Sequence, residues 1–263
     1  MKISSTRTDN SQGHAVLRGC ISFLFWCGIW WILSLIIQKS VLLPSPPAVF
    51  RVLCSLCLQG EFWLSILSSL LRVLLGYAAG CAVGVLIASL CFVSRIADTI
   101  LSPLMSVVRA VPVASFIILA LVWLERGIVP AFIALLMVLP VIVGNVRTGI
   151  ENTDPSLIET AQIFRFSRAT KIRYLYFPAA LPYFLSGART SLGLAWKAGV
   201  AAEVLCSLAV SIGGNIYESK LYLETDALFA WTITVILISV LIEKILFRFT
   251  IRRKTSEKAE VPV

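Results

Sequence analysis

The apolar residues of this chain fall into long runs separated by short polar segments. Six runs reach the length of about 20 residues that a helix needs to cross a bilayer. We therefore predict an all-α integral membrane protein with six transmembrane helices, forming one domain over residues 17–247 between a polar tail (1–16) and a basic tail (248–263). The predicted spans cover residues 17–37, 64–93, 101–124, 128–146, 183–206 and 227–247.

Two shorter patterns lie beside these runs. Pro44, Pro46 and Pro47 predict an extended elbow after the first span, followed by a short surface helix over residues 48–58. Three glycines repeat at four-residue steps in the second span, which indicates close packing against another helix. They are Gly76, Gly80 and Gly84.

The composition agrees with a membrane protein and excludes several kinds of chemistry. Hydrophobic residues make up 58% of the 263 residues and charged residues only 14%, against about 25% in soluble domains. The chain has one histidine, His14, and its Cys54-x-x-Cys57 pair has no second pair to complete a zinc site. We therefore expect no metal, no cofactor and no catalytic residues on this chain.

The basic residues predict the orientation in the membrane. With the amino terminus inside, 15 Lys and Arg residues fall in inside segments and four in outside segments. The positive-inside rule then places both termini in the cytoplasm. This topology and contact with lipid headgroups account for the net charge of +9 without a nucleic-acid partner.

The segment 147–182 is the longest polar stretch between predicted spans. Asp154 and Pro155 predict a helix start, and Ser167 predicts a second helix that runs to Phe177 and ends at Pro178. A basic amphipathic segment of this kind either lies on anionic lipid or contacts a partner protein. Its predicted apolar face consists of Leu157, Ile158, Ala161 and Phe164, with Arg165, Arg168, Lys171 and Arg173 nearby.

Several motifs occur in an order and spacing that resemble the permeases of binding-protein-dependent ABC transporters, in the nitrate/sulfonate/taurine branch. The segment Glu159-Thr160-Ala161 resembles the "EAA" loop of that family, although Arg165 replaces the family's glycine and so predicts a differently shaped turn. The other motifs are Leu43-Pro44-Ser45-Pro46, Ser69-Leu70-Leu71-Arg72-Val73 with Gly76, Arg109-Ala110-Val111-Pro112, Gly187-Ala188-Arg189, Trp196, Ala202-Glu203 and Gly213-Gly214.

The resemblance implies a transport subunit in the inner membrane of a bacterium that takes its energy from another chain. No phosphate-binding loop of the GxxxxGK type is present, so ATP and Mg would bind to two copies of a cytoplasmic ABC ATPase. An extracytoplasmic solute-binding protein would dock near residues 44–47 and 211–226, and two copies of this chain would form a homodimer. The ATPase-coupling residues implied are Leu157, Ile158, Glu159, Thr160, Ala161, Phe164 and Arg165.

Among the charged residues of the predicted spans, five form a candidate pathway or internal charge network. Their excess of positive charge favours a small anionic solute, such as a sulfonate, taurine or nitrate. We expect the single acid among them to pair with Arg189 or Lys197. The five residues are Arg72, Arg109, Arg189, Lys197 and Glu203.

Two other classes of protein remain as alternatives. An ion-coupled secondary transporter or a channel would suit the spans, but such proteins commonly carry internal repeats, and none is evident here. A membrane enzyme acting on lipid-linked substrates would need clustered acids, histidines or metal ligands, and the acids of this chain are scattered.

Overall fold

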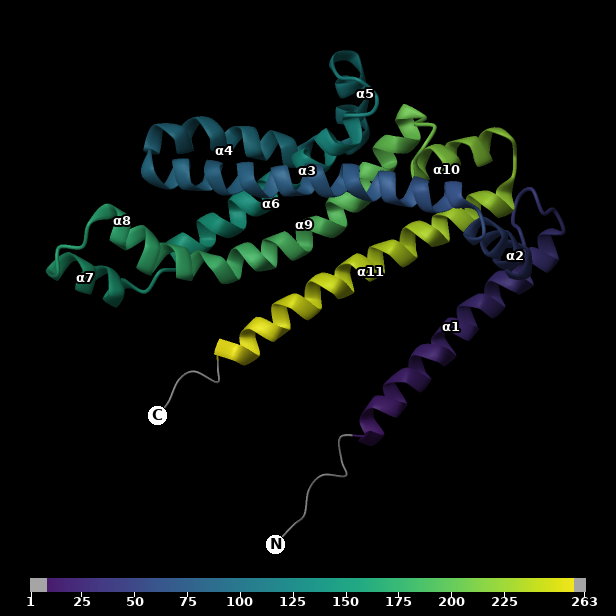
Figure 1. The fold of residues 1–263 in the computed structure, drawn as a ribbon, viewed down its shortest axis with the longest axis horizontal. Helices are drawn as coiled ribbons and strands as arrows, with labels where there is room; N and C mark the ends of the chain where they lie inside the picture. The colour runs from purple at the N-terminus through teal and green to yellow at the C-terminus, as the bar shows by residue number, and fades with distance from the viewer. Residues whose placement is uncertain (1–8, 258–263) are drawn as a thin grey trace, which may run out of the picture.

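The computed structural model describes residues 9–257 as α-helices joined by short connections (Figure 1). Helices begin and end beyond the predicted limits, since the first helix starts at Asp9 and the last ends at Glu257; residues 1–8 and 258–263 of the two tails lie outside the described residues. The elements are α1 (Asp9–Ile37), α2 (Pro46–Cys57), α3 (Gly60–Val93), α4 (Arg95–Ala110), α5 (Val113–Trp123), α6 (Val129–Glu151), α7 (Pro155–Ile163), α8 (Arg168–Lys171), the π-helical η1 (Ile172–Tyr176), α9 (Phe177–Cys206), α10 (Ile212–Leu221) and α11 (Thr225–Glu257).

The core of the bundle lies between α3, α6 and α9, which run side by side in Figure 1. Trp196 on α9 is buried there and donates its indole N–H to the carbonyl oxygen of Val235 on α11, over 3.1 Å. The three glycines of α3 pack closely against another helix, as the sequence predicts, and that helix is α6. A Cβ atom on Gly80 would lie 2.8 Å from Cβ of Val138, and one on Gly84 would lie 2.9 Å from Cβ of Ile142.

The predicted third span is broken. Helices α4 and α5 meet at an angle of 108° instead of forming one helix over residues 101–124. Pro112 has no N–H to continue the α4 hydrogen bonds, and it disfavours the helical conformation of the residue before it. Val111 accordingly adopts an extended backbone, with φ −76° and ψ 132°.

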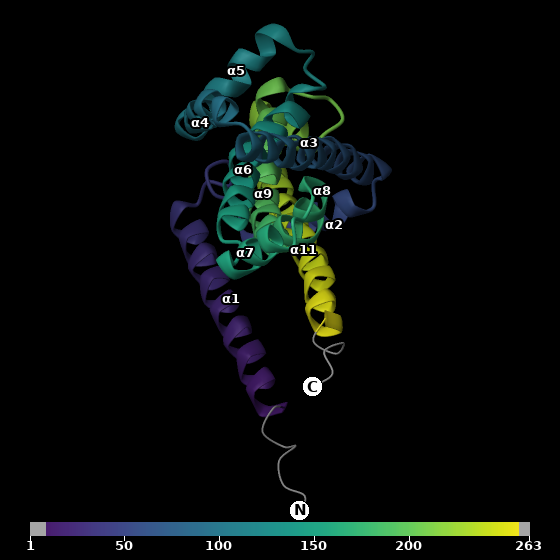
Figure 2. The ribbon, with the colours of Figure 1, turned by 90° about the vertical axis from the view of Figure 1, so that its left-hand side faces the viewer.

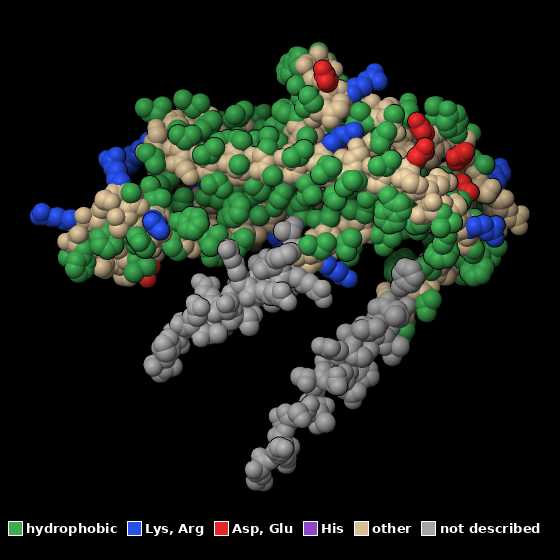
Figure 3. All heavy atoms as spheres, in the orientation of Figure 1, with side chains coloured by type: hydrophobic (Ala, Val, Ile, Leu, Met, Phe, Trp, Pro, Cys, Tyr) green, Lys and Arg blue, Asp and Glu red, His purple; other side chains and the backbone are tan. Residues whose placement is uncertain are grey.

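Within residues 9–257, three helices are long and apolar enough to cross a membrane by themselves: α3, α6 and the part of α11 from Thr225 to Ile245. The bent pair α4 and α5 adds a fourth crossing if it is counted as one span. Large apolar side chains cover much of the visible surface in Figure 3, as expected for a protein surrounded by lipid. The six-span topology itself stays a prediction.

Helix α1 projects away from the bundle and is held at one end (Figure 2). The indole N–H of Trp30 donates to the carbonyl oxygen of Pro44 over 3.1 Å, and the Trp30 ring stacks on Phe229 at 5.6 Å. The hydroxyl of Ser34 donates to the carbonyl oxygen of Leu43. An elbow therefore connects α1 to α2, but of the three prolines only Pro44 lies in it. Pro46 and Pro47 form the first turn of α2, where a missing N–H is tolerated, so the surface helix begins two residues earlier than predicted.

Candidate functional site

The segment 147–182 begins as the sequence predicts. The Asp154 carboxylate accepts the backbone N–H of Ser156 over 2.9 Å, and Pro155 occupies the first turn of α7. This hydrogen bond favours the ionised form, so the pKa of Asp154 lies below its ordinary value. Helices α7 and α8 form the knob at one end of the molecule, at the left in Figure 1.

The end of α7 corrects the prediction made for Arg165. The residue adopts the left-handed conformation, with φ 51°, that the family's glycine would supply. Two hydrogen bonds close the turn: the N–H of Phe166 donates to Ala161 over 2.9 Å, and the N–H of Arg165 donates to Gln162 over 3.0 Å. These two bonds form a Schellman motif, so the turn keeps the shape that a glycine would give it. The left-handed conformation costs free energy here because Arg165 has a Cβ atom.

The second helix of the segment does not end at Pro178. Ser167 caps α8 as predicted, accepting the N–H of Thr170 over 3.2 Å, but the chain then continues through η1 directly into α9. The N–H of Phe177 bonds to the carbonyl oxygen of Ile172, five residues back. In this wider turn the backbone hydrogen bonds span five residues instead of four. Pro178 then lies in the first turn of α9, where a missing N–H is tolerated.

The apolar face of α7 differs in part from the predicted one. Leu157 and Phe164 are exposed, whereas Ala161 is 1% exposed and Ile158 is half-buried, so these two pack within the chain itself. Ile163 is 77% exposed, a residue that the helical-face argument missed. It lies in the last turn of α7, where the chain bends away and no neighbour covers it.

The polar residues of α7 point outward. Glu159 and Thr160 are exposed, and the Thr160 hydroxyl donates to the carbonyl oxygen of Ser156 over 2.8 Å. Arg165 and Arg168 are also exposed, and Lys and Arg side chains gather at this end of the molecule in Figure 3. The knob therefore presents one acid, several cations and a few large apolar side chains.

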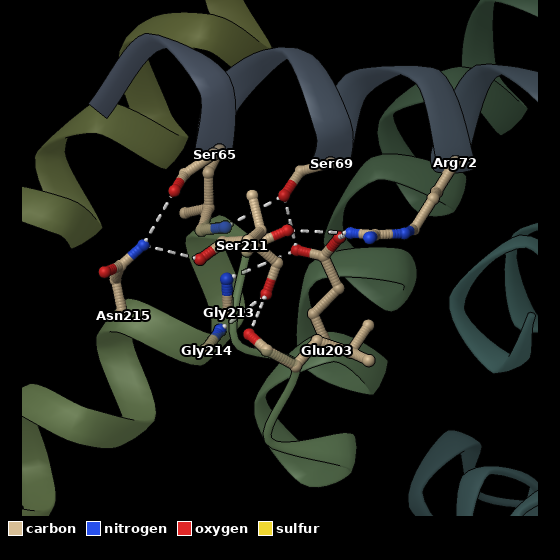
Figure 4. A network of polar contacts seen from close by, with 11 residues as sticks. Ser65, Ser69, Arg72, Glu203, Ser211, Gly213, Gly214 and Asn215 are labelled. Atoms are coloured by element: carbon tan, nitrogen blue, oxygen red, sulfur yellow. Dashed lines mark hydrogen bonds and ion pairs between the residues drawn. The ribbon is translucent and has the colours of Figure 1, made fainter. Parts of the chain in front are cut away.

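A second polar site lies inside the bundle and centres on Glu203 (Figure 4). Its carboxylate is fully buried and accepts the Ser69 hydroxyl over 2.6 Å and the Gly213 N–H over 3.2 Å. A guanidinium nitrogen of Arg72 lies 3.4 Å from the other oxygen. The Ser69 oxygen in turn accepts the N–H of Ile212 over 2.9 Å, so the network joins α3, α9 and the start of α10.

This network corrects the predicted pairing of Glu203 with Arg189 or Lys197. Arg189 instead lies 3.6 Å from the carboxylate of Glu243 on α11, and Lys197 is exposed. Helix packing determines which side chains face the interior. Two residues that pair across distant helices therefore show no spacing pattern in the sequence that would reveal the pair. Ser69 and Glu243 were missed for that reason.

Arg109 lies at the end of α4, beside α6. Its guanidinium donates to the carbonyl oxygen of Pro140 over 2.6 Å. A Cβ atom on Gly144 would lie 2.9 Å from the same guanidinium, so the glycine leaves the space that the side chain occupies. The five predicted residues therefore do not form one network: Arg72 pairs with Glu203, Arg189 lies near Glu243, Arg109 bonds to α6, and Lys197 is exposed.

Comparison with known proteins identifies the class. Residues 80–254 match the family described as the binding-protein-dependent transport system inner membrane component. This match covers more than half of the chain, so the chain belongs to that family. It is a transport component and not an enzyme.

Relatives agree with the resemblance to the nitrate and sulfonate branch. The chain is 31% identical over 205 residues to the putative aliphatic sulfonates transport permease protein SsuC of Bacillus subtilis, covering 77% of this chain and 74% of the relative. It is 28% identical over 214 residues to the nitrate import permease protein NrtB of Synechocystis, covering 78% and 77%. The crystal structure of an amino acid ABC transporter shares the fold, with a TM-score of 0.62 at 16% identity over 73% of this chain and 93% of the other.

Proposed function

We propose that this chain is the permease subunit of an ATP-driven ABC importer for a small anionic solute. The family match over residues 80–254 carries the proposal, because the chain has a transport fold and no ATP-binding loop of its own. In this proposal the protein lies in the inner membrane of a bacterium with six spans and both termini in the cytoplasm. Two copies of an ABC ATPase bind ATP and Mg, and an extracytoplasmic protein delivers the solute.

The knob formed by α7 and α8 supports a docking role toward the ATPase. Glu159 is an exposed acid in the middle of α7, where a basic residue of a partner can reach it and form a charge-assisted hydrogen bond. Leu157, Ile163 and Phe164 supply exposed apolar area. Ala161 is buried in this chain and therefore acts on the fold of the knob and not on the partner.

The connection of the knob to the spans supports a coupling role. Helix α6 ends at Glu151, three residues before the Asp154 cap of α7, and α8 continues through η1 into α9. Helices α6 and α9 pack against each other along the core. A partner that moved the knob would thereby move two core helices together.

The segments at the opposite end of the bundle support the proposal that a solute-binding protein docks there. The predicted loop 211–226 is mostly the helix α10, capped by Ser211, whose hydroxyl oxygen accepts the N–H of Gly214 over 2.8 Å. The hydroxyl of Thr225 donates to the carbonyl oxygen of Val41 over 2.7 Å, which joins this region to the elbow. The two segments therefore lie together and can form one surface.

The relatives and the charges together support an anionic solute. The names of the two relatives given above describe a sulfonate permease and a nitrate permease, and both solutes are oxyanions. Arg72 and Arg189 each lie near an acid, so the excess positive charge resides on Arg109 and Lys197, for which the described residues show no ion pair. A second copy of the chain would complete the path, since one bundle leaves these side chains exposed.

Co-purification tests the proposal. The tagged full-length chain is extracted in mild detergent from its own bacterium, as the native protein, as Glu159→Arg and as Glu218→Arg, which reverses an exposed acid on α10. We expect an ATP-binding subunit to accompany the native chain and Glu218→Arg, and to be lost with Glu159→Arg. A native chain that is folded and comes alone would refute the importer and favour an ion-coupled carrier. Retention of the subunit by Glu159→Arg would refute the role of that residue.

A further inference from the structure

A polar cavity of about 230 Å³ lies between α4 and α6. It is smaller than the pockets that hold drug-sized ligands, so it suits a small solute. Helix α4 contributes the hydroxyls of Ser102 and Ser106, and α6 contributes Gly144 and Thr148. Arg109 and Arg147 lie on its wall, together with Asp98.

The two guanidinium groups of this cavity differ in their partners. Arg147 donates to both oxygens of Asp98, over 2.6 and 3.1 Å, and also to Glu151 over 2.8 Å. Its charge is therefore compensated by two acids. Within residues 9–257, the one hydrogen bond of Arg109 goes to the carbonyl oxygen of Pro140, and no ion pair involves this residue.

The backbone beside Arg109 holds the guanidinium at the cavity wall. Because Gly144 has no side chain, the guanidinium lies directly against α6, and its bond to Pro140 orients it. A guanidinium has five N–H donors, and this carbonyl bond occupies one of its nitrogens. The remaining donors are the groups that can recognise an oxyanion in a bidentate manner.

The hydroxyl groups give the cavity its polar walls. Ser106 donates to the carbonyl oxygen of Ser102, and Thr148 donates to that of Gly144, so these hydroxyls satisfy their own helices. Discrimination between negative and positive solutes therefore depends on Arg109. We propose that this cavity is an oxyanion-binding site, centred on Arg109, for a nitrate, sulfonate or carboxylate group. The inference rests on the proposed function, since it names the group through which the permease would bind its solute.

Charged thiol reagents test the site on the full-length chain in lipid nanodiscs, without any partner. Ser106→Cys is introduced after the native cysteines are replaced by alanine. It is then treated with sulfonatoethyl or trimethylammonioethyl methanethiosulfonate, and each rate is divided by that of a free thiol. We expect the sulfonate reagent to react roughly tenfold faster, because one nearby guanidinium attracts it and repels the cation. Nitrate or ethanesulfonate is expected to slow the reaction, whereas choline is not.

Two further variants make the result specific. Arg109→Gln keeps a donor for the Pro140 carbonyl and is expected to remove the preference for the sulfonate reagent. Ser239→Cys lies in the pocket between α9 and α11, where Arg189 is 3.6 Å from Glu243, and is expected to show no such preference. If Ser106→Cys does not fold, Ser102→Cys replaces it in the same cavity.

Equal rates for the two reagents, or a preference for the sulfonate reagent that survives Arg109→Gln, would overturn the proposal. It is also overturned if neither anion slows the reaction, or if the folded Ser106→Cys variant reacts with neither reagent. The ATPase co-purification is independent of these results. If the ATPase still accompanies the chain, the oxyanion site alone is wrong; if the ATPase is also absent, the importer function fails as well.

Discussion

The Glu203 network offers the sharpest test of how this fold is held together. The carboxylate is fully buried, and removing it by Glu203→Ala leaves the Ser69 hydroxyl and the Gly213 N–H without their acceptor. Each buried donor left without an acceptor commonly costs about 1 to 3 kcal/mol. For the two donors we expect a loss of about 2 to 6 kcal/mol in the free energy of unfolding, and the Arg72 guanidinium adds little because it is 26% exposed.

A more conservative variant separates charge from shape. Glu203→Gln can still accept the Ser69 hydroxyl with its amide oxygen, but its NH₂ then faces the Arg72 guanidinium, which is 26% exposed. Loss of the charge-assisted bonds is worth about 1.5 to 3 kcal/mol. Glu203→Gln should therefore fall between the native protein and Glu203→Ala.

Unfolding of the detergent-solubilised chain, followed by tryptophan fluorescence during a denaturing-detergent titration, measures these differences. Glu218→Ala removes an exposed acid from α10 and serves as the control, with an expected change within about 0.5 kcal/mol. If Glu203→Ala were as stable as Glu218→Ala, the network would not hold α10 against α3 and α9, and the reasoning from burial would be wrong.

Three other changes test local features. Arg165→Gly should raise the free energy of unfolding by about 1 kcal/mol, because glycine adopts the φ of 51° without the cost of a side chain; a loss in the same titration would refute the strained turn. Gly76→Ala should cost about 1 to 3 kcal/mol, since its Cβ would fall on the carbonyl oxygen of Ala131, whereas Gly193→Ala, with open space, should be neutral; equal melting temperatures would contradict close packing. The pKa of Asp154 is lowered by the N–H that it accepts, so its contribution to the cap is complete at neutral pH and is lost as pH falls below about 3.9 and through the folded-state pKa. Proteolysis at the α7 start should rise with acid in the native chain more than in Asp154→Ala, and an equal response would refute the cap.

The sequence by itself determined the features that depend on local chemistry. Apolar runs of sufficient length predicted the helices, Asp154 and Ser167 predicted two caps, and the four-residue repeat of glycines predicted the face of α3 that meets α6. Each of these depends on residues within a few positions of one another. The order of motifs along the chain likewise indicated the family.

Only the tertiary structure decided the features that join distant parts of the chain. Pro112 marks in the sequence where α4 can end, but the angle of 108° between α4 and α5 was visible only in the structure. The turn at Arg165 kept its shape because the hydrogen bonds that close it outweigh the steric cost of one side chain. Glu203 bonded to Ser69, 134 positions away, since packing determines which polar groups share a buried space. Charges inside a membrane protein are recognisable in a sequence, but their partners are chosen by helix packing.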